Sequence, residues 1–308
     1  MPTARIVTSH SEHPVPESRT SRYEQRLRRV LRHIDLHLAD DVDLETLSDV
    51  AAFSKFHFHR QFVGALGIAA HRYVQLVRLK RAGYRLAFRD GDPIIAIALD
   101  SGYDSPEAFA RAFRQRLGQS PSEFRRRPAW PAWHALFAPV DEIRKAYMRQ
   151  SFRLDQVELV EVPDTPVAVL EHRGDPALIG DTIRRFIAWR QANGVTPRTS
   201  ATFNILYDDP ATTPPEEFRL DLCAAIDRDV PGAGSGIVRK TIPGGACAVL
   251  RHVGSEDGFG DAIMFLYASW LPQSGRELRD FPLYCRRVAF FPDVPAHEAV
   301  TDIYLPLR

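Results

Sequence analysis

The chain of 308 residues has few cysteines, no long apolar run and almost no net charge. Its three cysteines, Cys223, Cys247 and Cys285, are too few and too widely spaced for a disulfide framework or a CxxC zinc pair. We expect buried thiols in a reducing cytoplasm. Its uncharged apolar stretches, such as residues 93–99, are far shorter than the roughly 20 residues of a transmembrane helix. The first 20 residues have no apolar core, so neither a secretory signal nor a membrane partner is expected.

Sequence motifs of several enzyme classes are also missing. The chain has no GxSxG nucleophile motif and no GxxxxGK[ST] phosphate loop. His57 and His59 lie two residues apart on an expected helix and point in different directions, which is poor geometry for a shared metal ion. We therefore predict no catalytic residue, no metal and no cofactor.

The net charge of +1 conceals a difference between the two halves of the chain. Residues 1–150 carry 24 Lys and Arg against 17 Asp and Glu, whereas residues 151–308 carry 16 against 22. A basic half joined to an acidic half suggests a polyanion-binding domain attached to a domain of another kind. Length and composition predict two globular domains.

Helical periodicity extends from residue 21 to residue 127. Two segments in this range, residues 47–62 and 95–113, each predict a short helix, a turn and a second helix, and a long helix over residues 70–88 joins them. Four residues have the type and position of helix N-caps: Asp43, Ser54, Ser105 and Ser120. The second helix of each segment carries an arginine two residues before an aromatic residue: Arg60 and Phe62, and Arg111 and Phe113.

The second half predicts strands, turns and two helices arranged as an internal repeat. Shifting residues 167–183 by 80 gives identity at eight of 17 positions, and one inserted residue extends the match to Trp189 and Trp270. Two copies of a small α+β unit that share one core are therefore expected, with a cleft at their pseudo-twofold axis. We expect the repeat-related His172 and His252 to bond nearby carbonyl groups.

The predicted organisation is that of a multidomain α and α+β protein. A flexible tail (residues 1–20) precedes an all-α domain with two helix-turn-helix units (residues 21–128). A linker (residues 129–152) then leads to an α+β domain with a duplicated repeat (residues 153–308).

Residues 22–127 resemble the DNA-binding region of the AraC/XylS family of bacterial transcription regulators. The matching stretches are LSDVA at residues 47–51, FSKFHFHRQF at 53–62, RLKRA at 78–82, SGYDSPEAFARAF at 101–113 and GQSPSEFR at 118–125. Residues 153–308 resemble the GyrI-like (SHS2-repeat) small-molecule-binding domain, through the repeat, Asp208-Asp209-Pro210 and the closing DIYLPL. The resemblance implies a transcription regulator with double-stranded DNA and a small-molecule effector as partners, and RNA polymerase as a further candidate partner.

On the first candidate recognition helix, Phe56, His59 and Arg60 share one face, and the resemblance implies that they contact bases. Arg60 suits guanine O6 and N7, and Phe56 suits a thymine methyl group, with a place in the core as the alternative for Phe56. On the second helix the matching positions are Pro106, Glu107, Ala108 and Arg111. Arg111 is the best base reader there, and a surface salt bridge to Glu107 is its alternative. Four basic residues are expected to contact phosphates, with solvated charges as the alternative: Lys55, Arg78, Arg114 and Arg125.

The aromatic residues of the second half predict the effector site. Four of them are expected to line the cleft between the repeats: Tyr207, Trp270, Tyr284 and Tyr304. Relatives that sense several drugs have a buried glutamate near the position that Pro282 occupies in this chain. Because the glutamate is missing here, a neutral aromatic or apolar effector is expected. Glu298 is the nearby residue that could supply a carboxylate instead. A GyrI-like hydrolase and a protein-interaction module are the alternative functions of this domain.

Overall fold

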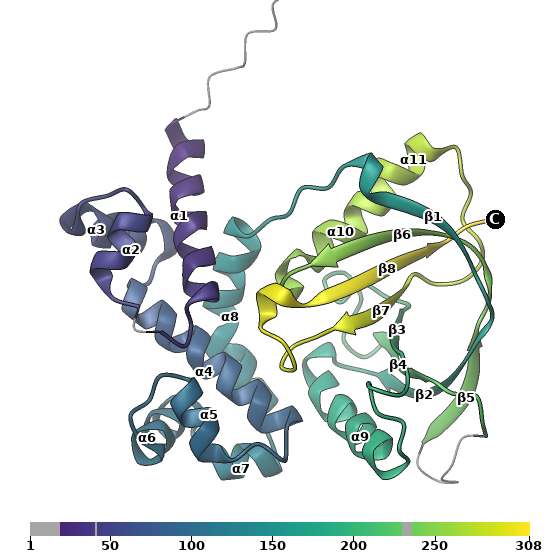
Figure 1. The fold of residues 1–308 in the computed structure, drawn as a ribbon, viewed down its shortest axis with the longest axis horizontal. Coiled ribbons are helices and arrows are strands. Elements are labelled where there is room, and N and C mark those ends of the chain that lie inside the picture. Colours follow the sequence, from purple (N-terminus) through teal and green to yellow (C-terminus); the bar gives the residue numbers. More distant parts are fainter. Residues whose placement is uncertain (1–18, 41, 230–235) are drawn as a thin grey trace, which may run out of the picture.

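A computed structural model describes residues 19–40, 42–229 and 236–308. The predicted tail of residues 1–20 lies outside the described residues, except for its last two, which begin a helix. The helices of the first half are α1 (Arg19–Leu36), α2 (Leu44–Val50), α3 (Lys55–Leu66), α4 (Ala70–Phe88), α5 (Ile94–Asp100), α6 (Pro106–Leu117), α7 (Pro121–Arg126) and α8 (Trp130–Tyr147). They pack together on the left of Figure 1, and α8 lies between the other helices and the sheet domain.

The N-cap predictions are confirmed. The side chains of Asp43, Ser54, Ser105 and Ser120 each accept a hydrogen bond from the backbone N–H three residues further along. Such caps satisfy backbone donors that have no partner within the helix. They fix where α2, α3, α6 and α7 begin, and so set the positions of the two helix-turn-helix units.

The segment predicted as a linker, residues 129–152, is for the most part α8. The side chains of Trp130, Trp133, Phe137 and Val140 are buried in the core of the helical domain. Their three- and four-residue spacing gives α8 an apolar face, and burial of that face makes α8 part of the helical domain. Only residues 148–152 connect α8 to the next domain.

The second half forms one antiparallel sheet. Its strands are β1 (Val157–Val162), β2 (Thr165–Arg173), β3 (Thr202–Leu206), β4 (Arg219–Ala225), β5 (Ile237–Ile242), β6 (Gly245–Val253), β7 (Tyr284–Ala289) and β8 (Val300–Pro306). They lie in the order β1-β6-β8-β7-β3-β4-β2-β5. This order is symmetric about the β7–β3 pair, and the first strand of each repeat pairs with the second strand of the other. The multidomain α and α+β class is confirmed.

The sheet is strongly curled. Only two residues connect β1, at one edge of the sheet, to β2, near the other edge. A link that short requires the two edges to approach each other at this end. The repeat-related turns meet there, because Gly244 N–H donates to Asp164 Oδ1 at 2.6 Å. Helices cover one face of the sheet, and we call the other, concave face the inner face.

The helices on the outer face show the repeat as well. The first repeat contributes α9 (Ile179–Ala192), and the second contributes α10 (Phe259–Phe265), a π-helical turn (Leu266–Trp270) and α11 (Leu271–Ser274). The residue inserted in the second repeat falls within this π turn, and a π turn accommodates one extra residue in a helix. His172 Nε2 and His252 Nε2 donate to the carbonyls of Asp175 and Ser255, as predicted.

Candidate nucleic-acid interface and effector site

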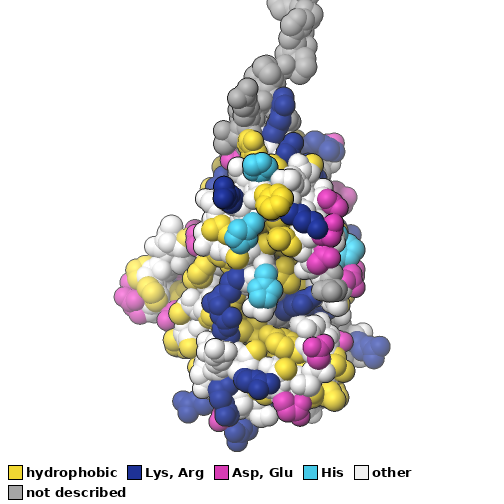
Figure 2. All heavy atoms as spheres, turned by 90° about the vertical axis from the view of Figure 1, so that its left-hand side faces the viewer, with side chains coloured by type: hydrophobic (Ala, Val, Ile, Leu, Met, Phe, Trp, Pro, Cys, Tyr) yellow, Lys and Arg dark blue, Asp and Glu magenta, His cyan; other side chains and the backbone are white. Residues whose placement is uncertain are grey.

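The helices α3 and α6 lie on the same side of the helical domain (Figure 1). Figure 2 shows this side of the molecule, where Lys, Arg and His side chains are spread over the surface. On α3, Phe56 is 87% exposed, and His59 and Arg60 are exposed beside it. Phe58 fills the core instead, so the core alternative for Phe56 is wrong. Phe56, His59 and Arg60 are therefore all accessible on this face of α3.

The second helix-turn-helix unit presents α6 in the same way. Glu107 and Arg111 are exposed, and Pro106 and Ala108 are half-buried at the start of the helix. Within the described part of the chain, Arg111 forms no ion pair with Glu107, so the salt-bridge alternative is not found. A hollow of about 450 Å³ beside α6 is lined in part by Arg111 and Arg114. Both side chains are exposed and can approach a polyanion.

Two of the predicted phosphate-contacting residues remain on the surface. Lys55 pairs with Glu45 at 2.9 Å, and Arg114 lies 3.6 Å from Glu123. All four side chains are about half exposed or more. Exposed pairs of this kind stabilise a protein by only about 0–1 kcal/mol, so DNA phosphates can compete for both cations.

The other two residues predicted to contact phosphates, Arg78 and Arg125, form hydrogen bonds within the domain. Arg78, on α4, donates to the carbonyls of Leu38 and Asp40. A methyl group at Gly102, in the turn of the second unit, would lie 2.7 Å from the Arg78 guanidinium. Arg125 donates to the carbonyl of Asp92 at 2.6 Å. Both side chains bond carbonyl groups within the domain and hold its parts together.

Three of the predicted effector residues meet on the inner face of the sheet. Tyr284 on β7 and Tyr304 on β8 are paired residues, and their rings stack at 4.8 Å with an interplanar angle of 7°. Tyr207, just after β3, belongs to the same apolar cluster. Tyr284 is only 3% exposed, whereas Tyr207 and Tyr304 are half-buried. The seam between the repeats is therefore filled by aromatic rings.

The other two predicted effector residues lie elsewhere, so the structure does not bring the five predicted residues together. Trp270 is 7% exposed and packs beneath the helices of the second repeat, on the outer face. Glu298 lies in a 3₁₀ turn before β8, exposed beside His297. It therefore precedes β8, which begins at Val300.

A buried carboxylate on the inner face was not anticipated from the sequence. Asp221 on β4 is 3% exposed and accepts hydrogen bonds from Tyr207 Oη at 3.0 Å and Lys240 Nζ at 2.7 Å. Lys240 also pairs with Glu171 at 2.7 Å. Burial alone would lower the pKa of Lys240, but Asp221 and Glu171 raise it, so the amine stays charged. A charged residue within the apolar strand RLDLCAA was the available signal.

The second repeat has a buried carboxylate at the corresponding position, and it too has a cationic partner. Asp302 on β8 is buried and accepts two hydrogen bonds from Arg251, at 2.7 and 2.9 Å. Asp221 and Asp302 are the buried carboxylates of the described residues. Each has a cationic partner within the protein, and Glu171, which shares Lys240 with Asp221, also pairs with Arg173, so the charges of this group are balanced.

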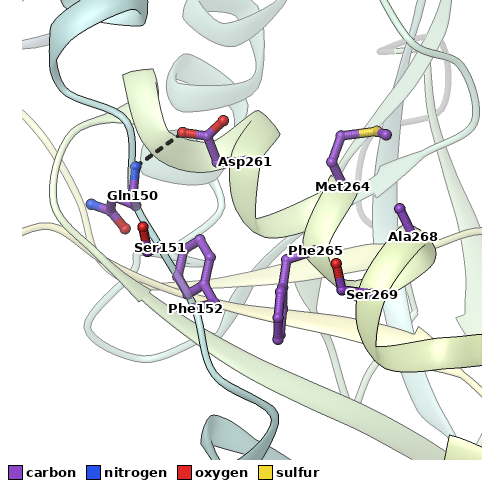
Figure 3. A pocket seen from close by; sticks show the side chains of 8 residues that line it. All are labelled: Gln150, Ser151, Phe152, Asp261, Met264, Phe265, Ala268 and Ser269. Atoms are coloured by element: carbon purple, nitrogen blue, oxygen red, sulfur yellow. Dashed lines mark hydrogen bonds between the residues drawn. The ribbon is translucent and has the colours of Figure 1, made fainter. Parts of the chain in front are cut away.

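A surface hollow of about 360 Å³ lies where residues 150–152 cross α10 (Figure 3). Phe152 and Phe265 form its apolar wall, with ring centroids 5.7 Å apart. Asp261 accepts a hydrogen bond from the backbone N–H of Gln150 at 3.0 Å. This hollow is on the outer face, away from the three tyrosines, and it marks where the connecting segment contacts the second repeat.

The three cysteines are buried, as predicted. Burial raises the pKa of Cys285 to about 12 and raises the pKa values of Cys223 and Cys247 as well. Thiols with raised pKa values are poor nucleophiles. None of the described helices is long and apolar enough to cross a membrane.

Comparison with known protein families identifies both halves. The model of the GyrI-like small molecule binding domain matches residues 155–308, half of the chain, and that of a helix-turn-helix domain matches residues 47–127. The chain belongs to the AraC-type helix-turn-helix regulators with a GyrI-like domain. This GyrI-like regulator thus joins a DNA-binding domain to a small-molecule-binding domain, as the resemblance implied.

Individual relatives of this GyrI-like regulator are named as regulators too. The probable transcriptional regulator YgiV of Escherichia coli K12 is 36% identical over 152 residues, which are 49% of this chain and 95% of YgiV. The transcriptional regulator Rob of Salmonella typhimurium is 25% identical over 80% of this chain and 84% of Rob. Among solved structures, EcmrR in a complex with DNA is 14% identical over 87% of this chain and 99% of EcmrR, with a TM-score of 0.42.

Proposed function

We propose that this chain is a one-component regulator in which α3 and α6 read two successive major grooves on one face of a duplex. The observation that carries the proposal is the pair of exposed helix faces, on which Arg60 and Arg111 occupy equivalent positions and form no ion pair with any residue that the structure describes. The joining helix α4 has 19 residues and so spans about 28 Å. Successive major grooves on one face of DNA lie about 34 Å apart, which a helix of this length can bridge together with its flanking units.

In this proposal Arg60 and Arg111 specify the sequence, whereas Lys55 and Arg114 contact phosphates. Phe56 and His59 add apolar and polar contacts to bases, and Glu107 orients Arg111 or accepts from a cytosine amino group. Selection of duplexes from a random pool by the full chain tests the proposal. Enrichment of a defined motif supports it, and retention of random DNA without enrichment contradicts it.

We further propose that the effector is a neutral, flat aromatic molecule that stacks on Tyr207 and Tyr304 at the inner face. The buried carboxylates Asp221 and Asp302 are neutralised by Lys240 and Arg251. The tyrosine ring of Tyr207 already has a guanidinium over it, because Arg219 lies 5.3 Å from the ring centroid. An incoming cation would meet charges that are already compensated, whereas a neutral ring gains apolar contact. Opening the Tyr284–Tyr304 stack would admit it.

The same ion pairs favour binding over hydrolysis. A carboxylate that activates water as a general base needs a lone pair directed at the water, and both buried carboxylates of the described residues are engaged by Lys or Arg. We therefore propose a regulator without catalytic activity, and RNA polymerase as the partner through which it acts once bound to DNA.

Thermal shift with two probes tests the effector class. We expect 1-naphthol to raise the melting temperature of the full chain and tetraphenylphosphonium to have a smaller effect. Tyr304→Ala should abolish the response to 1-naphthol. The matched control is Tyr267→Ala, since Tyr267 is an exposed tyrosine on the outer face. Stabilisation by the cation alone, by neither probe, or equally in Tyr304→Ala would contradict the proposed class.

A further inference from the structure

Both ends of α8 are hydrogen-bonded to the sheet domain. Near its start, Trp130 Nε1–H donates to Asp181 Oδ1 at 2.9 Å. Just after its end, the backbone N–H of Gln150 donates to Asp261 Oδ2 at 3.0 Å, the bond drawn in Figure 3. Asp181 and Asp261 are 80 residues apart, so they are the same position in the two repeats.

A second pair of contacts lies inside the first pair. His134 Nε2–H donates to the carbonyl of Ala177 at 2.9 Å, and Arg144 Nε–H donates to Asp257 Oδ2 at 2.6 Å. Ala177 and Asp257 are again 80 residues apart. Both pairs of contacts are centred near Pro139, in the middle of α8. The helix therefore lies across the axis that relates the two repeats and contacts each of them with one half.

The two halves of α8 also contact different parts of the DNA-binding domain. In its first half, Trp130 and Trp133 pack on Phe124 of α7, with ring centroids 5.9 and 5.2 Å apart. In its second half, Arg144 bonds Asp35 of α1 at 2.8 and 2.9 Å, and the hydroxyl of Tyr147 bonds the carbonyl of Ala65 in α3.

Arg144 is a buried charge that links the two domains. Its side chain is 7% exposed and lies between carboxylates from two domains, Asp35 and Asp257. Burial alone would lower the pKa of the guanidinium, but Asp35, Tyr73 and Asp257 raise it, so the charge is kept. Removing Arg144 would leave two carboxylates without their shared cation, which is strongly destabilising, whereas removing Asp257 leaves Arg144 paired with Asp35.

We propose that α8 couples the repeats to the DNA-binding units in a crossed pattern. The first repeat is coupled to the second unit (α5–α7), and the second repeat is coupled to the first unit (α1–α3). Arg184 of α9 supports the pattern, because it donates to the carbonyls of Arg125 and Arg126 at the end of α7. A change in the angle between the repeats would move the two halves of α8 against each other. Pro139 removes a backbone hydrogen bond near the middle of the helix and makes bending there easier.

The regulatory meaning of this coupling rests on the proposed effector binding, but the coupling itself can be measured without DNA or ligand. Hydrogen–deuterium exchange on the full chain compares Asp181→Ala with Asp257→Ala, both in the sheet domain. We expect Asp181→Ala to raise exchange in α5–α7 by about threefold or more and to leave α1–α3 unchanged. Asp257→Ala should do the reverse. Glu217→Ala, in an exposed loop, is the control and should change neither unit.

Equal loosening of both units by each variant, or of neither unit, would overturn the proposal. If Asp257→Ala fails to fold, Asp257→Asn keeps the shape of the side chain and removes only the charge, and the same crossed pattern is expected. The two proposals can fail separately. If the variants show the crossed exchange pattern but the full chain enriches no DNA motif, the coupling through α8 is supported and the reading of bases by α3 and α6 is contradicted.

Discussion

The indole of Trp130 lies directly on the backbone of Gly180, so that a methyl group added at this glycine would come within 2.3 Å of Trp130 Cζ2. The repeat-related Gly260 has open space around it. The contact between α8 and the first repeat therefore requires glycine at position 180. The second repeat also has a glycine at the corresponding position, Gly260, but no contact there requires it.

Alanine at these two positions should have opposite effects. Gly180→Ala forces Trp130 out of its place and should lower the free energy of unfolding by about 1–3 kcal/mol. Gly260→Ala meets no neighbour and should leave the free energy unchanged or raise it by up to about 1 kcal/mol, because alanine favours helix. Urea denaturation measures both. Equal stability of the two variants would contradict the packing described for Trp130.

Arg60→Ala and Arg111→Ala should each weaken binding to the selected duplex by roughly 1–3 kcal/mol, because each removes a bidentate contact to a guanine. Binding to random DNA should change much less. Fluorescence anisotropy with both duplexes gives the two affinities. If operator and random DNA lost the same amount, these residues would contact phosphates rather than bases.

Arg78→Ala should lower stability rather than remove a phosphate contact. The variant loses hydrogen bonds to the carbonyls of Leu38 and Asp40, and we expect a loss of about 1–3 kcal/mol in unfolding free energy. The slope of log K against log salt should stay unchanged, whereas Lys55→Ala should reduce it by about one unit. A reduced slope in Arg78→Ala with normal stability would restore the original expectation of a phosphate contact.

The ion pair between Asp257 and Arg144 should make the domain contact sensitive to acid. Burial alone would raise the pKa of Asp257, but Arg144 and Ser255 lower it below the usual aspartate value. The folded state thus binds the proton less well than the unfolded chain, so the stabilisation is complete above about pH 4 and is lost as the pH falls through the lowered pKa.

Urea denaturation of the wild-type chain and Asp257→Asn from pH 7 to pH 3 checks this dependence. The difference in unfolding free energy between the two proteins should be constant from pH 7 to pH 5 and shrink below about pH 4. A difference that already shrinks between pH 7 and pH 5 would show that another group controls the contact.

Local patterns predicted the helical half well. Caps such as Ser54 and Ser105 act within a few residues, so the sequence alone shows where α3 and α6 begin and which residues they expose. The hydrogen-bond partners of Arg78 were not predictable in this way, because the carbonyl groups that accept from it belong to a turn 38–40 residues earlier in the chain. The apolar face of α8 is visible in the sequence, but Pro131 and Pro139 made the segment resemble a linker.

The sheet domain shows the opposite balance. The 80-residue shift predicted the two equivalent halves, yet the exchange of β1 and β5 between repeats depends on long-range pairing that no local pattern reveals. Tyr284 and Tyr304 were predicted to lie close together, and their rings do stack, because both are on strands near the seam. Trp270 does not lie beside them, because it belongs to a helical segment on the outer face.

The cytoplasmic location stays a prediction.

The motif enriched from a random duplex pool by the full chain tests the central claim most directly. Two recognition helices held by α4 predict a motif of two different half-sites, about 10–10.5 base pairs apart from centre to centre. Repeating the selection with Arg60→Ala should erase the base preference in one half-site only, and Arg111→Ala should erase it in the other. A single half-site, or the same half-site lost in both variants, would contradict reading by two helices in successive grooves.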